Sequence, residues 1–191
     1  MDMLDSYSVK IAADYIAQPL HHVISLSLMQ EKFPSCWKST KIIPLHKKGS
    51  TLKKEHYRPV AILSPLSKVL EKVVYEQLYS YFSKNKLFSE SLHGYRANRS
   101  TLTALLTMYE KWVTAASQNQ VTGVDLSVAF DLVSPDLLIK KLRVYGLDEG
   151  SLGWIYSYLT RRQQSVWIDH VFSESIETNI GVPQGSNLGI F

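Results

Sequence analysis

The strongest signal in this sequence lies in Val124-Asp125-Leu126-Ser127-Val128-Ala129-Phe130-Asp131, and the next strongest in Gly181-Val182-Pro183-Gln184-Gly185-Ser186. The first stretch places the carboxylate of Asp125 at the end of a short apolar run, residues 121–125, which we expect to form a buried strand. A strand of this kind would hold the carboxylate rigidly. The second stretch is typical of a turn whose backbone and Gln184 amide could grip a substrate. The sequence therefore predicts one site built from two distant segments.

Asp125 and Asp131 look at first like a pair of metal-binding carboxylates, but their spacing argues against a shared ion. Six residues of extended chain span about 20 Å, which is beyond the reach of one metal or a close metal pair. Asp125, at the strand end, is therefore the better ligand candidate. We expect Asp131 to lie at a helix start or in a loop.

Length and composition favour a folded soluble domain. The chain has 191 residues, of which 45% are hydrophobic and 20% charged, enough for one core or for one domain plus part of another. No apolar run is long enough for a membrane span, and residues 1–5 lack the features of a secretory signal. The single cysteine, Cys36, excludes an internal disulfide, and we expect it to be buried. We therefore expect an intracellular protein without a membrane partner, with nucleus and cytoplasm both open.

The net charge of +4 is distributed unevenly. Residues 32–58 carry eight basic side chains against one acid, Glu55, whereas acids outnumber bases from Asn119 onward. A basic segment suits phosphate groups and an acidic one suits metal ions. The alternative interpretation of the basic segment is a solvated, lysine-rich loop.

Local signals predict a chain dominated by helices. Apolar spacing indicates two helices within residues 4–30, divided near Pro19. Cap residues, two of them followed by proline, predict further helices beginning at Ser64-Pro65, at Ser100 or Thr101, and at Ser134-Pro135. A last helix is expected over residues 150–160. We expect the apolar and aromatic side chains of these helices to lie in the core: Leu102, Leu105, Leu106, Tyr109, Trp112, Val113, Trp154 and Tyr158.

A smaller number of segments have strand character. Residues 41–45 read as a strand that Pro44 pushes to the edge of a sheet. Residues 165–173 are typical of a hairpin that turns at Asp169-His170. With the strand around Asp125, these segments predict an α+β fold.

Several motifs occur in one order along the chain. They are Trp37-Lys38, Ile43-Pro44-Leu45-His46-Lys47-Lys48-Gly49, Tyr57-Arg58-Pro59-Val60, the helix start at Ser64-Pro65, His93-Gly94-Tyr95-Arg96, Asp125 with Phe130-Asp131, Arg161-Arg162-Gln163, and Pro183-Gln184-Gly185. In this order they resemble the reverse transcriptase domain of non-LTR (LINE-type) retrotransposons. The resemblance extends over residues 20–191. It implies a right-hand polymerase fold and an RNA-directed DNA polymerase that extends a DNA primer on an RNA template with dNTPs.

The resemblance also implies roles for particular residues. Asp125 would be the catalytic carboxylate and, with the carbonyl of Leu126, would bind the Mg²⁺ ions of a two-metal site. The incoming dNTP would be held by Arg58, Lys47 or Lys48, Phe130, Gln184 and Gly185, with Phe130 excluding a 2′-hydroxyl. Arg96 and Arg99 would contact template phosphates, with simple solvation as the alternative. Taken singly, Phe130 could equally be core, Arg58 a surface ion pair and Gln184 a turn residue.

The family completes its metal site with an Asp-Asp pair beyond the Pro-Gln-Gly motif, and these residues contain no such pair. Ile190 also stands where the family usually has proline. We therefore expect an N-terminal helical extension (residues 1–31), fingers (32–118) and an incomplete palm (119–191), truncated before the catalytic hairpin and thumb and inactive alone. The alternatives are a non-catalytic nucleic-acid-binding remnant and an incomplete gene product. The oligomeric state stays open.

Overall fold

The computed structural model describes residues 5–117 and 129–190, which form a mixed α+β fold. The helices in chain order are α1 (Ser6–Ile11), α2 (Ala13–Met29), α3 (Pro65–Lys84), α4 (Thr101–Ala116), α5 (Pro135–Val144) and α6 (Glu149–Leu159). The strands are β1 (Ser39–His46), β2 (Tyr57–Ile62), β3 (Arg162–Ile168), β4 (Val171–Phe172) and β5 (Ile176–Thr178). Four short 3-10 turns join them: η1 (Ser35–Trp37), η2 (Lys54–His56), η3 (Ala129–Leu132) and η4 (Leu188–Ile190).

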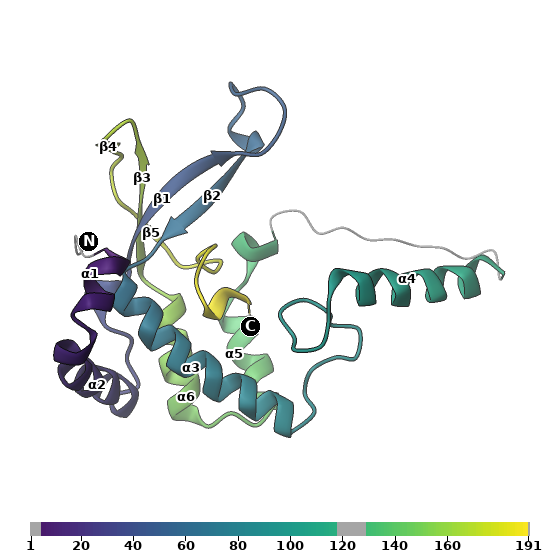
Figure 1. The fold of residues 1–191 in the computed structure, drawn as a ribbon, viewed down its shortest axis with the longest axis horizontal. Helices are drawn as coiled ribbons and strands as arrows, with labels where there is room; N and C mark the ends of the chain where they lie inside the picture. The colour runs from purple at the N-terminus through teal and green to yellow at the C-terminus, as the bar shows by residue number, and fades with distance from the viewer. Residues whose placement is uncertain (1–4, 118–128, 191) are drawn as a thin grey trace.

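The strands form a mixed sheet in which β1 lies between β2 and β3 (Figure 1). β1 runs antiparallel to β2 and parallel to β3, so the expectation that Pro44 would place its strand at a sheet edge is wrong. The pairing of β1 with β3 ends at Ile42, two residues before Pro44, and Pro44 lies opposite only Pro59 of β2. The missing N–H of Pro44 therefore falls where the strand has a single neighbour, which a sheet tolerates.

The core lies where α3 packs with α6, α5 and α2 below the sheet (Figure 1). Phe33 meets the rings of Trp154 and Tyr158 edge to face, with centroids 5.6 Å and 5.0 Å apart. Trp154 also donates from Nε1 to the Ser27 hydroxyl at 2.9 Å. The prediction that Trp154 and Tyr158 belong to the core is confirmed, since they are 3% and 2% exposed.

Helix starts follow the predicted cap residues. α3 begins at Pro65, α4 at Thr101 after a capping box on Ser100, and α5 at Pro135 with the Ser134 hydroxyl accepting from the Leu137 N–H. α6 begins one residue before the expected segment, after Asp148 accepts from the Ser151 N–H. The predicted hairpin is also present, with β3 and β4 joined by Asp169 and His170, both at positive φ.

The predicted division of the N-terminal helices at Pro19 is wrong. The break lies at Ala12, between α1 and α2, and Pro19 lies inside α2. Proline in a helix leaves the carbonyl four residues earlier without its N–H partner, here the carbonyl of Tyr15. Because Tyr15 is 86% exposed, water can serve that carbonyl and the helix continues.

Two burial predictions are also wrong. The apolar stripe of α4 is exposed, with Leu105 at 60% and Trp112 at 46%, and Figure 1 shows α4 extending away from the sheet and the other helices. Helical periodicity identifies an apolar face without identifying what covers it. Cys36 is exposed as well, because η1 turns its neighbour Trp37 into the core and Cys36 away from it.

Among the described residues, none of the helices combines the length and apolarity that a membrane crossing needs.

Candidate functional site

The candidate site is built around the loop of residues 181–187, which is hydrogen-bonded to both β2 and η3. The Ala61 N–H of β2 donates to the carbonyl of Gln184 at 2.8 Å. On the other side, the Val182 N–H donates to the carbonyl of Phe130 in η3 at 2.9 Å. The loop therefore joins the sheet to the turn that follows the predicted Asp125 strand.

These bonds bring three predicted site residues, Phe130, Gln184 and Gly185, from two distant segments of the sequence to one small cavity. The cavity has a volume of about 170 Å³ and is lined by Tyr95, Phe130, Pro183, Gln184, Gly185, Ser186 and Gly189. The Phe130 ring is not core, because the residue is 41% exposed. An aromatic face and an amide side chain thus face a shared space that is open to solvent.

Gly185 allows the loop to lie against β2. Its φ is +112°, and a Cβ added there would come within 3.0 Å of the Ala61 carbonyl oxygen. Any other residue would be strained by the backbone conformation and crowded by the strand. Glycine is therefore needed here so that the loop can lie close to the backbone of β2.

The side chain of Gln184 is oriented by a residue that sequence reasoning set aside. Its Nε2 donates to both carboxylate oxygens of Asp131, at 2.9 Å and 3.1 Å. A carboxylate only accepts, so the amide nitrogen must face it. Asp131 lies in the short 3-10 turn η3, where the sequence predicts a helix start or a loop. No sequence signal joins the two residues, because 53 positions separate them.

The basic residues predicted to hold the triphosphate lie along the same hairpin but outside the lining of the cavity. Lys47 and Lys48 are exposed in the loop after β1, and Arg58 is exposed near the start of β2. The Lys47 N–H donates to the His56 carbonyl at 2.8 Å, closing the hairpin. β2 then runs from this basic loop to Ala61, beside the cavity. β2 therefore connects the residues predicted to hold the triphosphate to the edge of the cavity.

The two arginines of residues 93–99 are engaged within their own loop. Arg96 donates to the Ser89 carbonyl at 2.8 Å and lies over the Phe88 ring. Arg99 pairs with Glu90 at 3.1 Å. These contacts shape the loop that brings Tyr95 to the cavity, a role that the sequence did not reveal.

The predicted metal ligands, Asp125 and Leu126, lie outside the described residues. Within residues 5–117 and 129–190, no group of three acidic, histidine or cysteine side chains is placed to hold a metal ion. Asp131, the carboxylate beside the cavity, is directed at Gln184. The assignment of Asp125 and Leu126 as metal ligands therefore stays a prediction.

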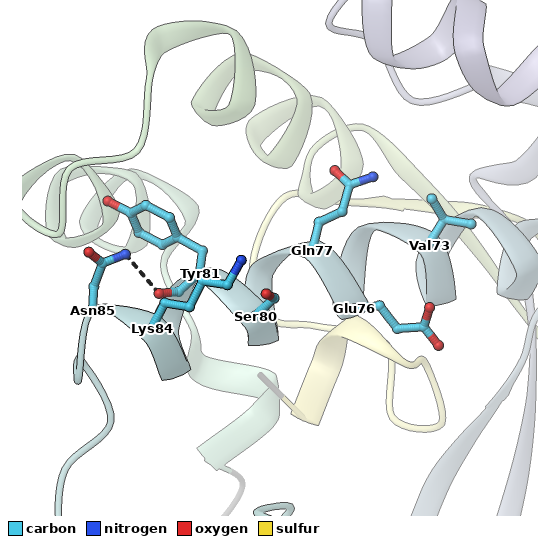
Figure 2. Close-up of a pocket in the computed structure, with 7 residues that line it drawn as sticks. All are labelled: Val73, Glu76, Gln77, Ser80, Tyr81, Lys84 and Asn85. Atoms are coloured by element: carbon cyan, nitrogen blue, oxygen red, sulfur yellow. Dashed lines mark hydrogen bonds between the residues drawn. The ribbon is translucent and has the colours of Figure 1, made fainter.

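Two of the larger hollows in the described part of the chain lie away from this site. A groove of about 990 Å³ follows β1, β2 and β3, with lining that includes Ile42, Tyr57 and Trp167. A second hollow, of about 530 Å³, lies along α3 and is lined by Val73, Glu76, Gln77, Ser80, Tyr81, Lys84 and Asn85. Figure 2 shows these last side chains spread along one helix, where Asn85 donates to the Tyr81 carbonyl at 2.9 Å. Neither hollow contains a predicted site residue.

Behind the loop lie charged and polar groups withdrawn from solvent. Arg162 is 2% exposed and donates to the Tyr158 carbonyl at 3.0 Å and to the Thr40 hydroxyl at 3.3 Å. Burial lowers the pKa of Arg162 from its ordinary value and raises that of the Tyr158 hydroxyl. The loop therefore rests on a polar layer as well as on apolar side chains.

Comparison with known proteins places this architecture in a family. Residues 45–190 match the reverse transcriptase (RNA-dependent DNA polymerase) family, and the chain belongs to that family. The matched region contains β2, the residues around Phe130 and the Pro183-Gln184-Gly185 loop.

Similar proteins come from mobile elements of Drosophila melanogaster. The RNA-directed DNA polymerase from mobile element jockey is 30% identical over 98% of this chain, and the probable RNA-directed DNA polymerase from transposon BS is 28% identical over 91%. The probable RNA-directed DNA polymerase from transposon X-element is 30% identical over 82%. The chain covers 21%, 20% and 18% of the jockey, BS and X-element proteins respectively, about a fifth of their length. The resemblance to non-LTR retrotransposon reverse transcriptases is thereby confirmed.

Proposed function

We propose that this chain supplies the nucleotide-selecting part of an RNA-directed DNA polymerase of a non-LTR retrotransposon. The polymerase would add dNTPs to a DNA 3′ end on an RNA template. The observation that carries the proposal is the meeting of Phe130 and Gln184 at one cavity, from two segments far apart in sequence, in a chain of this family. Residues 32–118 would be the fingers and residues 119–191 part of the palm of a right-hand polymerase, with residues 1–31 as a helical extension.

Three residues of the cavity have roles under this proposal. The exposed Phe130 ring would lie against the sugar and exclude a 2′-hydroxyl, since a rigid ring held by η3 leaves that oxygen no space. Gln184, held by Asp131, would contact the incoming nucleotide. Gly185 would let the backbone of the loop approach the nucleotide closely.

Charged residues would hold the phosphates. Arg58 would bind through its planar guanidinium, with Lys47 or Lys48 acting as a point charge from the exposed hairpin loop. Arg96 and Arg99 would contact the template by exchanging part of their loop contacts for phosphate oxygens.

Asp125 and the Leu126 carbonyl would hold Mg²⁺, which supplies charge neutralisation for phosphoryl transfer when bound. A two-metal site needs further carboxylates, and the 191 residues contain no Asp-Asp pair. Those carboxylates would come from a segment outside these residues, so we expect the chain to be inactive alone. Primer extension on an RNA template with dNTPs and Mg²⁺, comparing this chain with Asp125→Ala, tests this. Incorporation that disappears in the variant would overturn the expectation of inactivity.

Nucleotide selection is tested by equilibrium binding of dTTP and UTP with Mg²⁺ to the wild type and to Phe130→Val. We expect the preference for dTTP to fall about tenfold or more in the variant, because a smaller side chain admits the 2′-hydroxyl. Phe172→Val, on β4 and 55% exposed, is the matched control and should keep the preference. Equal binding of dTTP and UTP by the wild type would contradict the proposal.

A non-catalytic nucleic-acid-binding role is the second candidate. Lys47, Lys48, Lys53 and Lys54 are all exposed around one hairpin loop, which favours phosphate binding without chemistry. RNA binding that weakens with salt, together with no dNTP binding, would favour this second function.

A further inference from the structure

A buried glutamate lies behind the loop that carries Gln184. Glu71 of α3 is fully buried, at 0% exposure, and so is Ser67 one turn earlier. Arg162 of β3 and Thr40 of β1 are each 2% exposed in the same polar layer. Burying a carboxylate costs desolvation free energy unless hydrogen bonds and nearby charges compensate for the lost water. The hydrogen-bond partners of Glu71 therefore indicate its role in the structure.

One partner of Glu71 belongs to its own helix and the other to the distant loop. Oε1 accepts from the Ser67 hydroxyl at 2.9 Å, and Oε2 accepts from the backbone N–H of Asn187 at 2.9 Å. The side-chain Nδ2 of Asn187 donates to the Lys68 carbonyl at 2.9 Å. Two bonds thus fasten Asn187 to α3, and one of them depends on the Glu71 carboxylate.

The fastening point is three residues from Gln184 in a loop with little freedom between them. The Ser186 N–H donates to the Pro183 carbonyl at 3.1 Å, which closes a turn around Gln184. The Ser186 hydroxyl accepts from the Gly189 N–H at 2.9 Å. A shift of Asn187 would therefore move the turn that presents the Gln184 amide.

Opposing effects act on the pKa of the Glu71 carboxyl. Burial is the main effect and raises the pKa of the carboxyl above its ordinary value of 4.5. The bonds from Ser67 and Asn187, and the charges of Arg162 and Lys68, act in the opposite direction. Tyr158 is the other titratable group that interacts electrostatically with Glu71, and the charge of Glu71 raises its pKa.

We propose that Glu71 is a positioning residue, which sets the Gln184 side chain in the cavity by holding the backbone N–H of Asn187. The effect on nucleotide binding rests on the function proposed above, whereas the positioning itself does not. A purely structural role predicts something different, namely that losing Glu71 weakens the whole fold without a particular change at Asn187 or Gln184.

The first experiment follows the amide proton resonance of Asn187 by NMR as the pH is changed, in the 191-residue chain. In the wild type the resonance should titrate with the Glu71 carboxyl, at a midpoint above 4.5. In Glu71→Gln, which keeps the size and an acceptor oxygen, the titration should be lost while the protein stays folded. Glu76→Ala, which removes an exposed glutamate of the same helix, should retain it. Loss of titration in both variants, or in neither, would overturn the proposal.

The second measurement reports on Gln184 itself. In Glu71→Ala the side-chain amide resonances of Gln184 should move toward those of Asp131→Ala, in which the orienting carboxylate is absent. Rescue by Glu71→Gln should bring them most of the way back. Unchanged Gln184 resonances in a folded Glu71→Ala protein would overturn the proposal.

The link to nucleotide binding uses dTTP with Mg²⁺ as the probe. Glu71→Ala and Gln184→Ala should weaken binding by a similar factor, and the double variant should lose no more than either alone. Independent, multiplying losses would show that Glu71 does not act through Gln184. If the wild type binds no dTTP, the proposed function fails, while the two NMR measurements still decide the positioning role.

Discussion

Replacing Gly181 by alanine tests whether the loop and η3 are packed as closely as the structure requires. Gly181 has a φ of +83°, and a Cβ added there would lie 2.9 Å from the carbonyl oxygen of Asp131 and 3.0 Å from its Cα. Both neighbours are backbone atoms, which cannot rotate aside as a side chain can. The substitution therefore strains two segments of the site at once.

The expected change in the free energy of unfolding combines two destabilising effects and one stabilising effect. The left-handed conformation costs an L-residue about 1–2 kcal/mol, and crowding against packed backbone costs about 1–3 kcal/mol. Alanine restricts the unfolded chain, which offsets about 0.4–1 kcal/mol. We expect Gly181→Ala to lower the free energy of unfolding by about 2–4 kcal/mol.

Urea denaturation followed by tryptophan fluorescence measures this change, with an unchanged m value showing that the unfolding transition is comparable. Gly153→Ala is the matched control, since Gly153 lies within α6 and an added Cβ would meet only the Glu31 side chain, at 3.4 Å from Oε2 and 3.8 Å from Cβ. That variant should be stabilised by about 0.5–1 kcal/mol, because alanine favours the helix. A neutral or stabilised Gly181→Ala beside a stabilised Gly153→Ala would refute the close packing of the loop on η3.

Three further substitutions probe the groups around the site and the core. Burial raises the pKa of the Glu71 carboxyl above 4.5, so the contribution of this group to stability is full below pH 4.5 and is lost as the pH rises through the folded-state pKa. In Glu71→Gln the decline of the urea midpoint between about pH 4 and pH 8 should therefore be flatter than in the wild type. An equal decline in both proteins would contradict this prediction. Asp148 accepts from the Ser151 N–H at 2.9 Å and hydroxyl at 2.7 Å, and these bonds lower its carboxyl pKa below 3.8. Asp148→Ala should therefore cost about 1 kcal/mol at neutral pH, and progressively less as the pH falls through that lowered pKa; an equal cost throughout would be inconsistent with capping by the ionised form. Trp154→Phe removes the 2.9 Å bond to Ser27 and should lower the free energy of unfolding by about 1–2 kcal/mol; an unchanged urea midpoint would count against that bond.

The parts of the fold that the sequence predicted have local causes. α3 and α5 begin at Ser-Pro pairs, because proline suits the first turn of a helix, and in α5 the Ser134 hydroxyl also caps the helix. The turn between β3 and β4 has two residues at positive φ, Asp169 and His170, as a tight hairpin needs. Such signals lie within a few residues of one another, so one sequence is enough to see them.

The errors have a common origin in contacts between distant segments. Helical spacing identified the apolar face of α4 correctly as a stripe, but the covering partner is not encoded in the helix itself. β2 was not predicted as a strand, since Pro59 lies in its middle and its pairing with β1 is what makes it one. The same holds for the site, where the bond from Asn187 to Glu71 spans 116 positions.

The contact of Asp131 with Gln184 is not predicted by the argument against Asp131 as a metal ligand beside Asp125. The chain spacing that separates Asp131 from Asp125 says nothing about a contact with Gln184, and that contact occupies both carboxylate oxygens. The amide nitrogen of Gln184 is thereby committed, and its Oε1 is the side-chain atom that this contact leaves for another donor. Glu71 holds the same loop from behind, through Asn187. Two carboxylates outside the predicted set of site residues therefore bond this segment, Asp131 at the Gln184 side chain and Glu71 at the Asn187 backbone, and supporting hydrogen bonds of this kind hold a site side chain in one geometry.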